Sequence, residues 1–171
     1  MAYFQTNTVS GFTARIYYEE KNGVISITDI QIQSKTYGGP TWYLGGEIKI
    51  DGTTVLSMSY KSPATHAVNV FSAGDSWIPI QVVNGTALPV SSGLIVGKTS
   101  VDITVNIELF RKSGDATPGL SGSQTVSVSA GFVYIDSGSG FEPYEAYIDN
   151  GTSWDRYIPY VDNGSSWDMC N

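Results

Sequence analysis

The sequence predicts an all-β fold, an antiparallel β-sandwich of Ig-like or jelly-roll topology, on three observations. Before residue 136 apolar and polar residues alternate with period two, turn residues recur about every 8–12 residues, and helical apolar periodicity is absent. Alternation of this kind is typical of antiparallel sheets with one buried and one solvated face. We therefore expect about seven to nine short strands over residues 1–136.

The clearest strand lies at residues 101–109, where Val, Ile and Leu occupy odd positions and polar residues occupy even ones. Four other segments repeat this pattern: residues 12–18, 42–50, 78–82 and 126–130. Within residues 24–34 the phase slips, since Ile25 and Ile27 fall on odd positions whereas Ile30 and Ile32 fall on even ones. This slip predicts a β-bulge near Thr28-Asp29.

Pairs of turn residues separate several apolar runs and predict tight hairpins. A type I′ turn requires positive φ at both central residues, which favours Asn-Gly and Asp-Gly. The sequence has three such pairs before residue 136: Asn22-Gly23, Asp51-Gly52 and Asn84-Gly85. Pro79 lies inside an apparent strand, so that strand is expected to be an edge strand or to begin there.

Composition indicates a folded chain with an acidic C-terminal segment. Of 171 residues 41% are hydrophobic and 15% are charged, enough apolar content for one core. The net charge is −7, and residues 137–171 hold six acidic residues and one basic residue, Arg156. Because no Lys/Arg cluster exists, we expect neither nucleic acid nor anionic membranes as partners. No apolar run approaches the ~20 residues of a membrane span, so we expect no membrane insertion.

Two tandem units form the C-terminal segment. Residues 144–155 and 157–168 repeat at an offset of thirteen, with eight of twelve positions identical, as Tyr-x-x-Tyr-[Ile/Val]-Asp-Asn-Gly-[Thr/Ser]-Ser-Trp-Asp. The composition of the Ser/Gly-rich segment before them predicts a linker. The predicted organisation is a sandwich domain at 1–136, a linker at 137–143 and tandem repeats at 144–171.

Each unit is expected to form a hairpin around its Asn-Gly pair, with Tyr147 near Trp154 and Tyr160 near Trp167. An isolated hairpin is marginally stable, so we expect the units to lie against the sandwich, another subunit or a ligand. Two interpretations stay open: the aromatic side chains pack against protein, or they stack on sugar rings. The candidate binding or docking residues are Tyr144, Tyr147, Asn150, Trp154, Tyr157, Tyr160, Asn163 and Trp167.

The residues predict no catalytic, cofactor-binding or metal-binding site. The single histidine, His66, has no carboxylate near it in sequence and is expected to be an ordinary strand-end or loop residue. The single cysteine, Cys170, excludes an internal disulfide. Asp149, Asp155, Asp162 and Asp168 offer oxygens to calcium, but their spacing does not match the twelve-residue calcium loop. An enzyme would need carboxylates that the fold alone brings together.

Three segments carry a resemblance to a known group of proteins. Residues 1–34, MAYFQTNTVSGFTARIYYEEKNGVISITDIQIQS, and residues 100–130, SVDITVNIELFRKSGDATPGLSGSQTVSVSA, are the first two. They resemble small β-sandwich modules in minor structural and tail-associated proteins of siphophages that infect Gram-positive bacteria. The phrase YIPYVDNGSSWD at residues 157–168 is similar to short aromatic units that end many such proteins.

The resemblance implies a virion component that assembles in the host cytoplasm, in homo-oligomers and with other virion proteins. The N-terminal MAYFQTNTVSG, which lacks a basic segment and an apolar run, fits this expectation of no signal peptide. The predicted function is a structural or accessory virion protein, tail-associated or capsid-decorating. The alternative is a carbohydrate-binding module for host surface glycans, and a glycoside-active enzyme is the third interpretation. The resemblance implies no catalytic residue and no cofactor.

Overall fold

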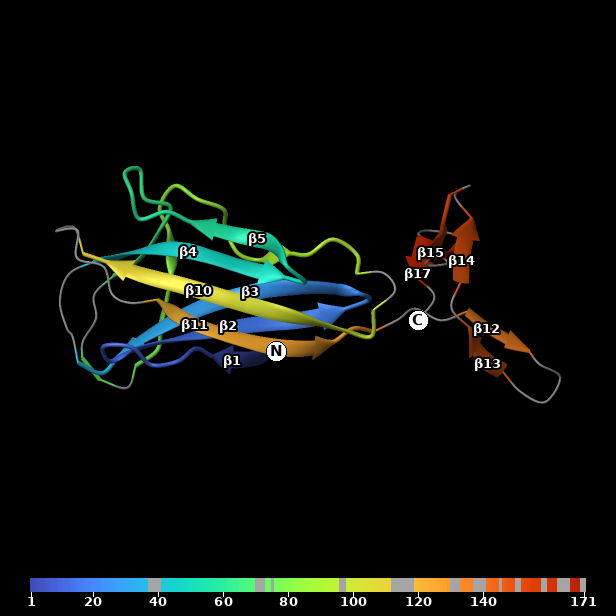
Figure 1. The fold of residues 1–171 in the computed structure, drawn as a ribbon, viewed down its shortest axis with the longest axis horizontal. Coiled ribbons are helices and arrows are strands. Elements are labelled where there is room, and N and C mark those ends of the chain that lie inside the picture. Colours follow the sequence, from blue (N-terminus) through green and yellow to red (C-terminus); the bar gives the residue numbers. More distant parts are fainter. Residues whose placement is uncertain are drawn as a thin grey trace.

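The computed structural model confirms an all-β antiparallel sandwich, with no helix among the described residues (Figure 1). It describes residues 1–36, 41–69, 73–74, 76–95, 98–111 and 119–129. Beyond them it describes the backbone of residues 133–136, 141–144, 146–149, 152–157, 160–162 and 167–169. Within this described part no helix has the length and apolar character needed to cross a bilayer.

Two antiparallel sheets form the sandwich, and their strands run along its length in Figure 1. The first sheet has the order β1 (Ala2–Gln5), β2 (Phe12–Lys21), β3 (Val24–Ser34) and β7 (Ile78–Pro79), with β9 (Val90–Ser91) also paired to β3. The second has the order β11 (Leu120–Ser127), β10 (Ser100–Phe110), β4 (Trp42–Ile50), β6 (His66–Val68) and β8 (Gln81–Val82), with β5 (Thr53–Met58) paired to β4.

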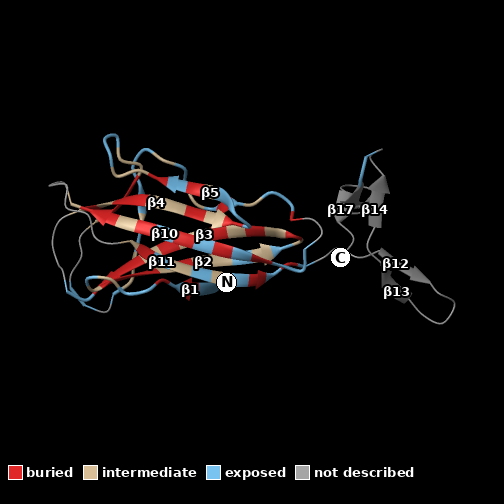
Figure 2. Cartoon of the chain, in the orientation of Figure 1, coloured by how far each residue is buried: buried red, intermediate tan, exposed pale blue. Residues whose placement is uncertain are grey.

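The core lies between the sheets and follows the predicted alternation. On β10 every apolar residue at an odd position is buried, and Asp102, Thr104 and Asn106 between them are exposed. Figure 2 shows this alternation of buried and exposed residues along the strands. The largest fully buried side chains are Phe12, Ile16, Ile25, Ile27, Ile30, Ile32, Leu44, Ile48, Ile50, Leu56, Ile103 and Ile107.

The predicted bulge in β3 is confirmed. Tyr17 pairs with Asp29 and the next residue, Tyr18, pairs with Ile27, so Thr28 is the extra residue. An extra residue reverses which face the following side chains occupy. Ile27 and Ile30 are therefore both fully buried although one position is odd and the other even.

Two of the three predicted turns are confirmed, and one is wrong. Asn22-Gly23 (φ 54° and 77°) and Asp51-Gly52 (φ 52° and 78°) have the positive φ pair of a type I′ turn. Asn84-Gly85 joins no hairpin, because β8 pairs with β6 in one sheet and β9 with β3 in the other. Here the Asn84 backbone N–H donates to the Thr65 carbonyl at 3.2 Å, so the pair lies against a neighbouring loop instead.

The expected strand at residues 78–82 is divided between the two sheets. Ile78 and Pro79 pair with β3, which confirms Pro79 on an edge strand, while Gln81 and Val82 pair with β6. Val82 is consequently exposed. Because of such two-residue strands, the five-stranded and six-stranded sheets together have more strands than the expected seven to nine.

Three short hairpins follow the sandwich strands, and each is a two-stranded sheet of its own. They are β12 (Val133–Asp136) with β13 (Phe141–Tyr144), β14 (Ala146–Asp149) with β15 (Trp154–Tyr157), and β16 (Tyr160–Asp162) with β17 (Trp167–Met169). The second and third are the two predicted hairpins. The first was not foreseen: β12 pairs with β13 and with neither sandwich sheet, and β13 includes residues 141–143 of the expected linker.

Candidate functional site

The three hairpins share one register at the thirteen-residue offset. Asp136 pairs with Phe141, Asp149 with Trp154, and Asp162 with Trp167. The segment 131–142 is therefore a third, degenerate unit, in which Phe141 stands where the others have Trp. The sequence motif that indicates this unit is Tyr-Ile-Asp-x-Gly at residues 134–138. It is not found by a search for the Asn-Gly pair and the Trp of the other two units.

The predicted binding residues all fall on or between these hairpin strands. Tyr147 pairs with Arg156 while Trp154 pairs with Asp149, so Tyr147 and Trp154 are diagonal neighbours two positions apart. Tyr160 and Trp167 have the same relationship in the third hairpin. Tyr144 and Tyr157 lie at strand ends of β13 and β15. Asn150 and Asn163 lie outside the described residues, as do the side chains of the aromatic residues and of the four aspartates considered for calcium.

A hollow of about 490 Å³ opens at the end of the sandwich where β4 begins. Its volume falls within the range of about 300–1,000 Å³ that ligand sites usually have. The sequence did not predict it, because its walls come from four separate parts of the chain. The lining residues are Tyr43, Tyr60, Ser62, Pro63, Ala64, Val83, Asn84 and Arg111. We refer to it as the tyrosine hollow.

Stacked rings support one wall of the tyrosine hollow. The Tyr60 ring is stacked on Phe110 with 3.3 Å between centroids and 10° between planes. Gly45 makes room for this pair, since a Cβ there would lie 2.9 Å from Tyr60 Cδ1. The Arg111 guanidinium lies over the Trp42 ring, 4.6 Å from its centroid, a cation–π contact. The positions of Tyr60 and Arg111 are thus fixed by rings beneath them.

His66 holds together two loops that form the other wall. It is fully buried, with Nε2 2.9 Å from the Thr86 carbonyl oxygen and Nδ1 2.9 Å from Thr65 Oγ1. Since a carbonyl accepts only, Nε2 carries a proton and donates it to the Thr86 carbonyl. The Ser59 N–H donates in turn to Thr65 Oγ1 at 2.8 Å. His66 begins β6, as expected of a strand-end histidine, but its burial was not foreseen.

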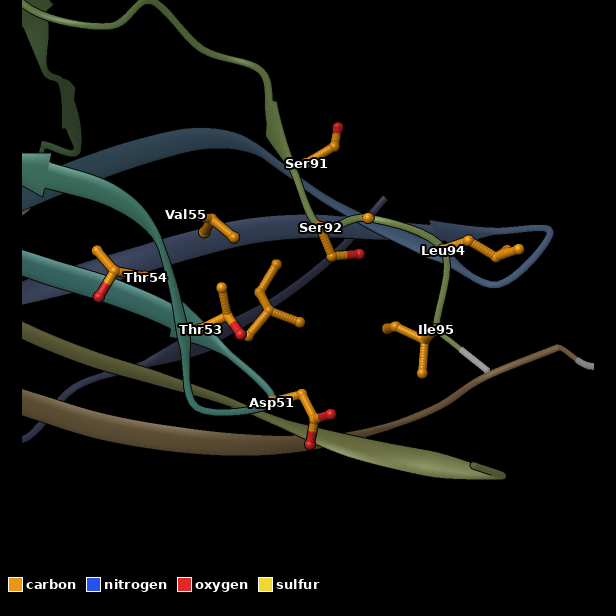
Figure 3. A pocket seen from close by; sticks show the side chains of 10 residues that line it. Asp51, Thr53, Thr54, Val55, Ser91, Ser92, Leu94 and Ile95 are labelled. Carbon is orange, nitrogen blue, oxygen red and sulfur yellow. The ribbon is translucent and has the colours of Figure 1, made fainter. Parts of the chain in front are cut away.

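A second hollow, of about 480 Å³, lies at the other end of β4 (Figure 3). Figure 3 shows Thr53, Ser91 and Ser92 with Leu94 and Ile95 around it. Its polar groups already serve the fold: Ser92 Oγ accepts the Ile25 N–H at 3.0 Å, and Lys98 Nζ pairs with Asp51 Oδ1 at 2.7 Å. No aromatic ring is among its lining residues.

A cationic and aromatic cluster lies on the first sheet. The Arg15 guanidinium carbon is 4.3 Å from the centroid of the Tyr3 ring and 4.0 Å from that of Trp77. Arg15 Nη1 also lies 3.4 Å from the Tyr17 hydroxyl. Tyr3 is 49% exposed. Trp, Tyr and Arg are the residue types most enriched at the energetic centres of protein interfaces.

In the described part of the chain, no three or more His, Cys, Asp or Glu side chains lie close enough together to hold a metal ion. The Lys49 ammonium, 2.6 Å from Glu47 Oε1, holds the pKa of Glu47 below its ordinary value, and a hydrogen bond from Thr54 acts in the same direction. Glu47 is solvated, so this is a surface ion pair.

No protein-family model, curated protein or solved structure matches this chain. The resemblance of residues 1–34, 100–130 and 157–168 to siphophage modules therefore stays a prediction.

Proposed function

We propose that the chain is a non-enzymatic structural or accessory virion protein that acts by protein–protein assembly. The observation that carries this proposal is the set of three separate two-stranded sheets in one register. A two-stranded hairpin is marginally stable in water, and about three strands or a packing partner are needed for independent stability. Three such units in tandem therefore serve contact with a second surface.

The core of the described residues lies within the sandwich itself. Among residues with described side chains, the buried apolar cluster extends from Phe4 to Val128 and joins both sheets. The C-terminal segment, by contrast, is strongly acidic over residues 137–171. Charge complementarity increases the rate and the specificity of association. A basic partner surface is accordingly expected, which favours another virion protein, since this chain itself has a net charge of −7 and no Lys/Arg cluster.

The virion assignment rests on the sequence resemblance, and the Arg15 cluster adds a second surface suited to protein contact. Arg15 with Tyr3 and Trp77 supplies the residue types that dominate interface energetics. A chain with two such surfaces can link one neighbour to the next. Assembly in the host cytoplasm requires no cofactor and no nucleic acid.

Sedimentation velocity tests the proposal on the full chain and on a variant that ends at residue 132. We expect the full chain to self-associate, or to co-sediment with purified virion proteins of the same phage, and the shortened chain to do neither. A full chain that stays monomeric at every concentration and binds no virion protein contradicts the proposal.

Carbohydrate binding by the hairpins is the second candidate. The shared register supports it, since an aromatic residue recurs opposite an aspartate at Phe141, Trp154 and Trp167. Regularly spaced rings suit a polymer with repeating sugar units. If the hairpins are the sugar site, replacing both Trp154 and Trp167 by Ala abolishes binding on a glycan array. Unchanged binding in that double variant excludes the hairpins as the sugar site.

A further inference from the structure

We propose that the tyrosine hollow binds an oligosaccharide, independently of the hairpins. The site is concave, lies on the sandwich and is lined by Tyr43, Tyr60 and Arg111 together with loop residues. Nothing in the assembly proposal requires this hollow, so the two proposals can fail separately.

The lining combines apolar faces with polar groups and has no carboxylate, a combination that suits sugars. A saccharide ring presents C–H faces and hydroxyl groups in close alternation, so a complementary site needs both ring or carbon surfaces and donors and acceptors. Tyr43, Tyr60, Pro63 and Val83 supply the apolar surfaces. The tyrosine hydroxyls, Ser62, Asn84 and Arg111 supply polar groups, and no carboxylate is among the lining residues.

The polar groups are held in place before a ligand arrives. Asn84 Nδ2 donates to the Ala64 carbonyl at 3.2 Å, which orients its amide and directs Oδ1 away from that bond. The N–H groups of Val83 and Asn84 both reach the Thr65 carbonyl, at 2.8 and 3.2 Å. His66 fixes the same two loops from below through Thr65 and Thr86. Preorganised walls lower the entropic cost of binding a small polar ligand.

A sugar suits this site better than an extended peptide does. Peptides that add to a sheet need an unpaired strand edge. The hollow is bounded by the loops at 62–64 and 83–84 and by ring faces, and the adjacent β6 already pairs with β4 and β8. The second hollow fits neither ligand as well, since its Ser92 and Asp51 bond within the protein.

A glycan array followed by titration calorimetry tests the proposal on the full chain. The probes are neutral hexose, N-acetylhexosamine and uronic acid oligomers. The variants are Tyr60→Ala, Asn84→Ala and Tyr60→Phe, and the matched control is Tyr3→Ala, the same truncation at an exposed tyrosine outside the hollow. Thermal melts identify any variant that has lost its fold. Asn84 is exposed, so Asn84→Ala is expected to fold normally.

We expect at least one class of oligomer to bind. Tyr60→Ala and Asn84→Ala should each weaken that binding about tenfold or more, Tyr60→Phe less, and Tyr3→Ala not at all. The Trp154→Ala, Trp167→Ala double variant should bind as the unmodified chain does. The proposal is overturned if no oligomer binds, if folded Asn84→Ala binds normally, or if Tyr3→Ala weakens binding equally. Loss of binding in the Trp double variant alone would assign the sugar to the hairpins instead.

Discussion

His66 Nε2 lies 2.9 Å from the carbonyl oxygen of Thr86, a residue twenty positions further along the chain. The bond is buried, and with Thr65 on the other ring nitrogen it connects the loop before β6 to the loop after β8. These loops bound the tyrosine hollow. One side chain therefore determines both local stability and the shape of the candidate site.

Replacing His66 by Ala is expected to destabilise the fold by about 2–4 kcal/mol. The substitution leaves a cavity and removes the partners of the Thr86 carbonyl and the Thr65 hydroxyl. Chemical denaturation measures the change. Thr86→Ala is the control, because Thr86 contributes its backbone carbonyl and its side chain is exposed. A free energy of unfolding that is equal in both variants would show that the His66 contacts do not stabilise these loops.

A pair of glycine substitutions tests the packing of the same region. A Cβ at Gly85 would lie 2.6 Å from His66 Cε1 and 2.7 Å from Thr65 Cβ, whereas a Cβ at Gly93 would meet nothing within 4 Å. Neither glycine has a positive φ. Gly85→Ala is expected to cost about 1–3 kcal/mol in unfolding free energy, and Gly93→Ala to be neutral or slightly stabilising. Equal melting temperatures for the two variants would contradict this packing.

Glu47 is expected to titrate below the ordinary pKa of glutamate. The bond from Lys49 is the first cause, and the Thr54 hydroxyl is the second. Because its pKa is lower in the folded than in the unfolded state, Glu47 stabilises the fold above the unfolded pKa. That contribution is lost as the pH falls through the folded pKa. An NMR titration of the Glu47 carboxyl carbon should show its midpoint rising in Lys49→Met, and an unchanged midpoint would refute the ion pair.

Shortened chains test whether the tandem array has three units. A chain that ends at residue 132 lacks all three hairpins, and one that ends at residue 140 keeps β12 without its partner β13. Unpaired strand edges promote aggregation. We expect both variants to have the same sandwich melting temperature, but the longer one to elute partly as aggregate on gel filtration. A third variant, ending at residue 144, restores the first hairpin and should be less aggregated. Identical elution of all three would argue against the third unit.

The strands of the sandwich could be predicted from the sequence wherever a local residue pattern determines the structure. Alternation located β4 and β10, and the phase slip located the extra residue Thr28, because side-chain direction on a strand depends on position parity alone. The turn at Asn84 was misread because non-local bonds to Thr65 replace the hairpin. The first hairpin was missed because Phe141 and Ser137 replace the Trp and Asn of the other units.

The tyrosine hollow could not be predicted from the sequence. Tyr60 follows β5 and lies fifty positions from Phe110 of β10. The two rings meet because β5 and β10 both pair with β4, where Gly45 leaves room for them. The buried position of His66 likewise depends on loops from both sides of the sheet. A repeated motif can be recognised in the sequence, so it supplies candidate residues before the structure is known. A site assembled from single, distant residues is recognised only once the fold has brought them together.

The central claim is that the hairpins depend on a second surface, and amide hydrogen exchange tests it most directly. In the dilute monomer, amides in β14 and β15 are expected to exchange near the rate of unstructured chain, while those in β10 stay protected. In the assembled state the hairpin amides should exchange about a hundredfold more slowly. Strong protection of β14 and β15 in the monomer, unchanged by assembly, would contradict the account.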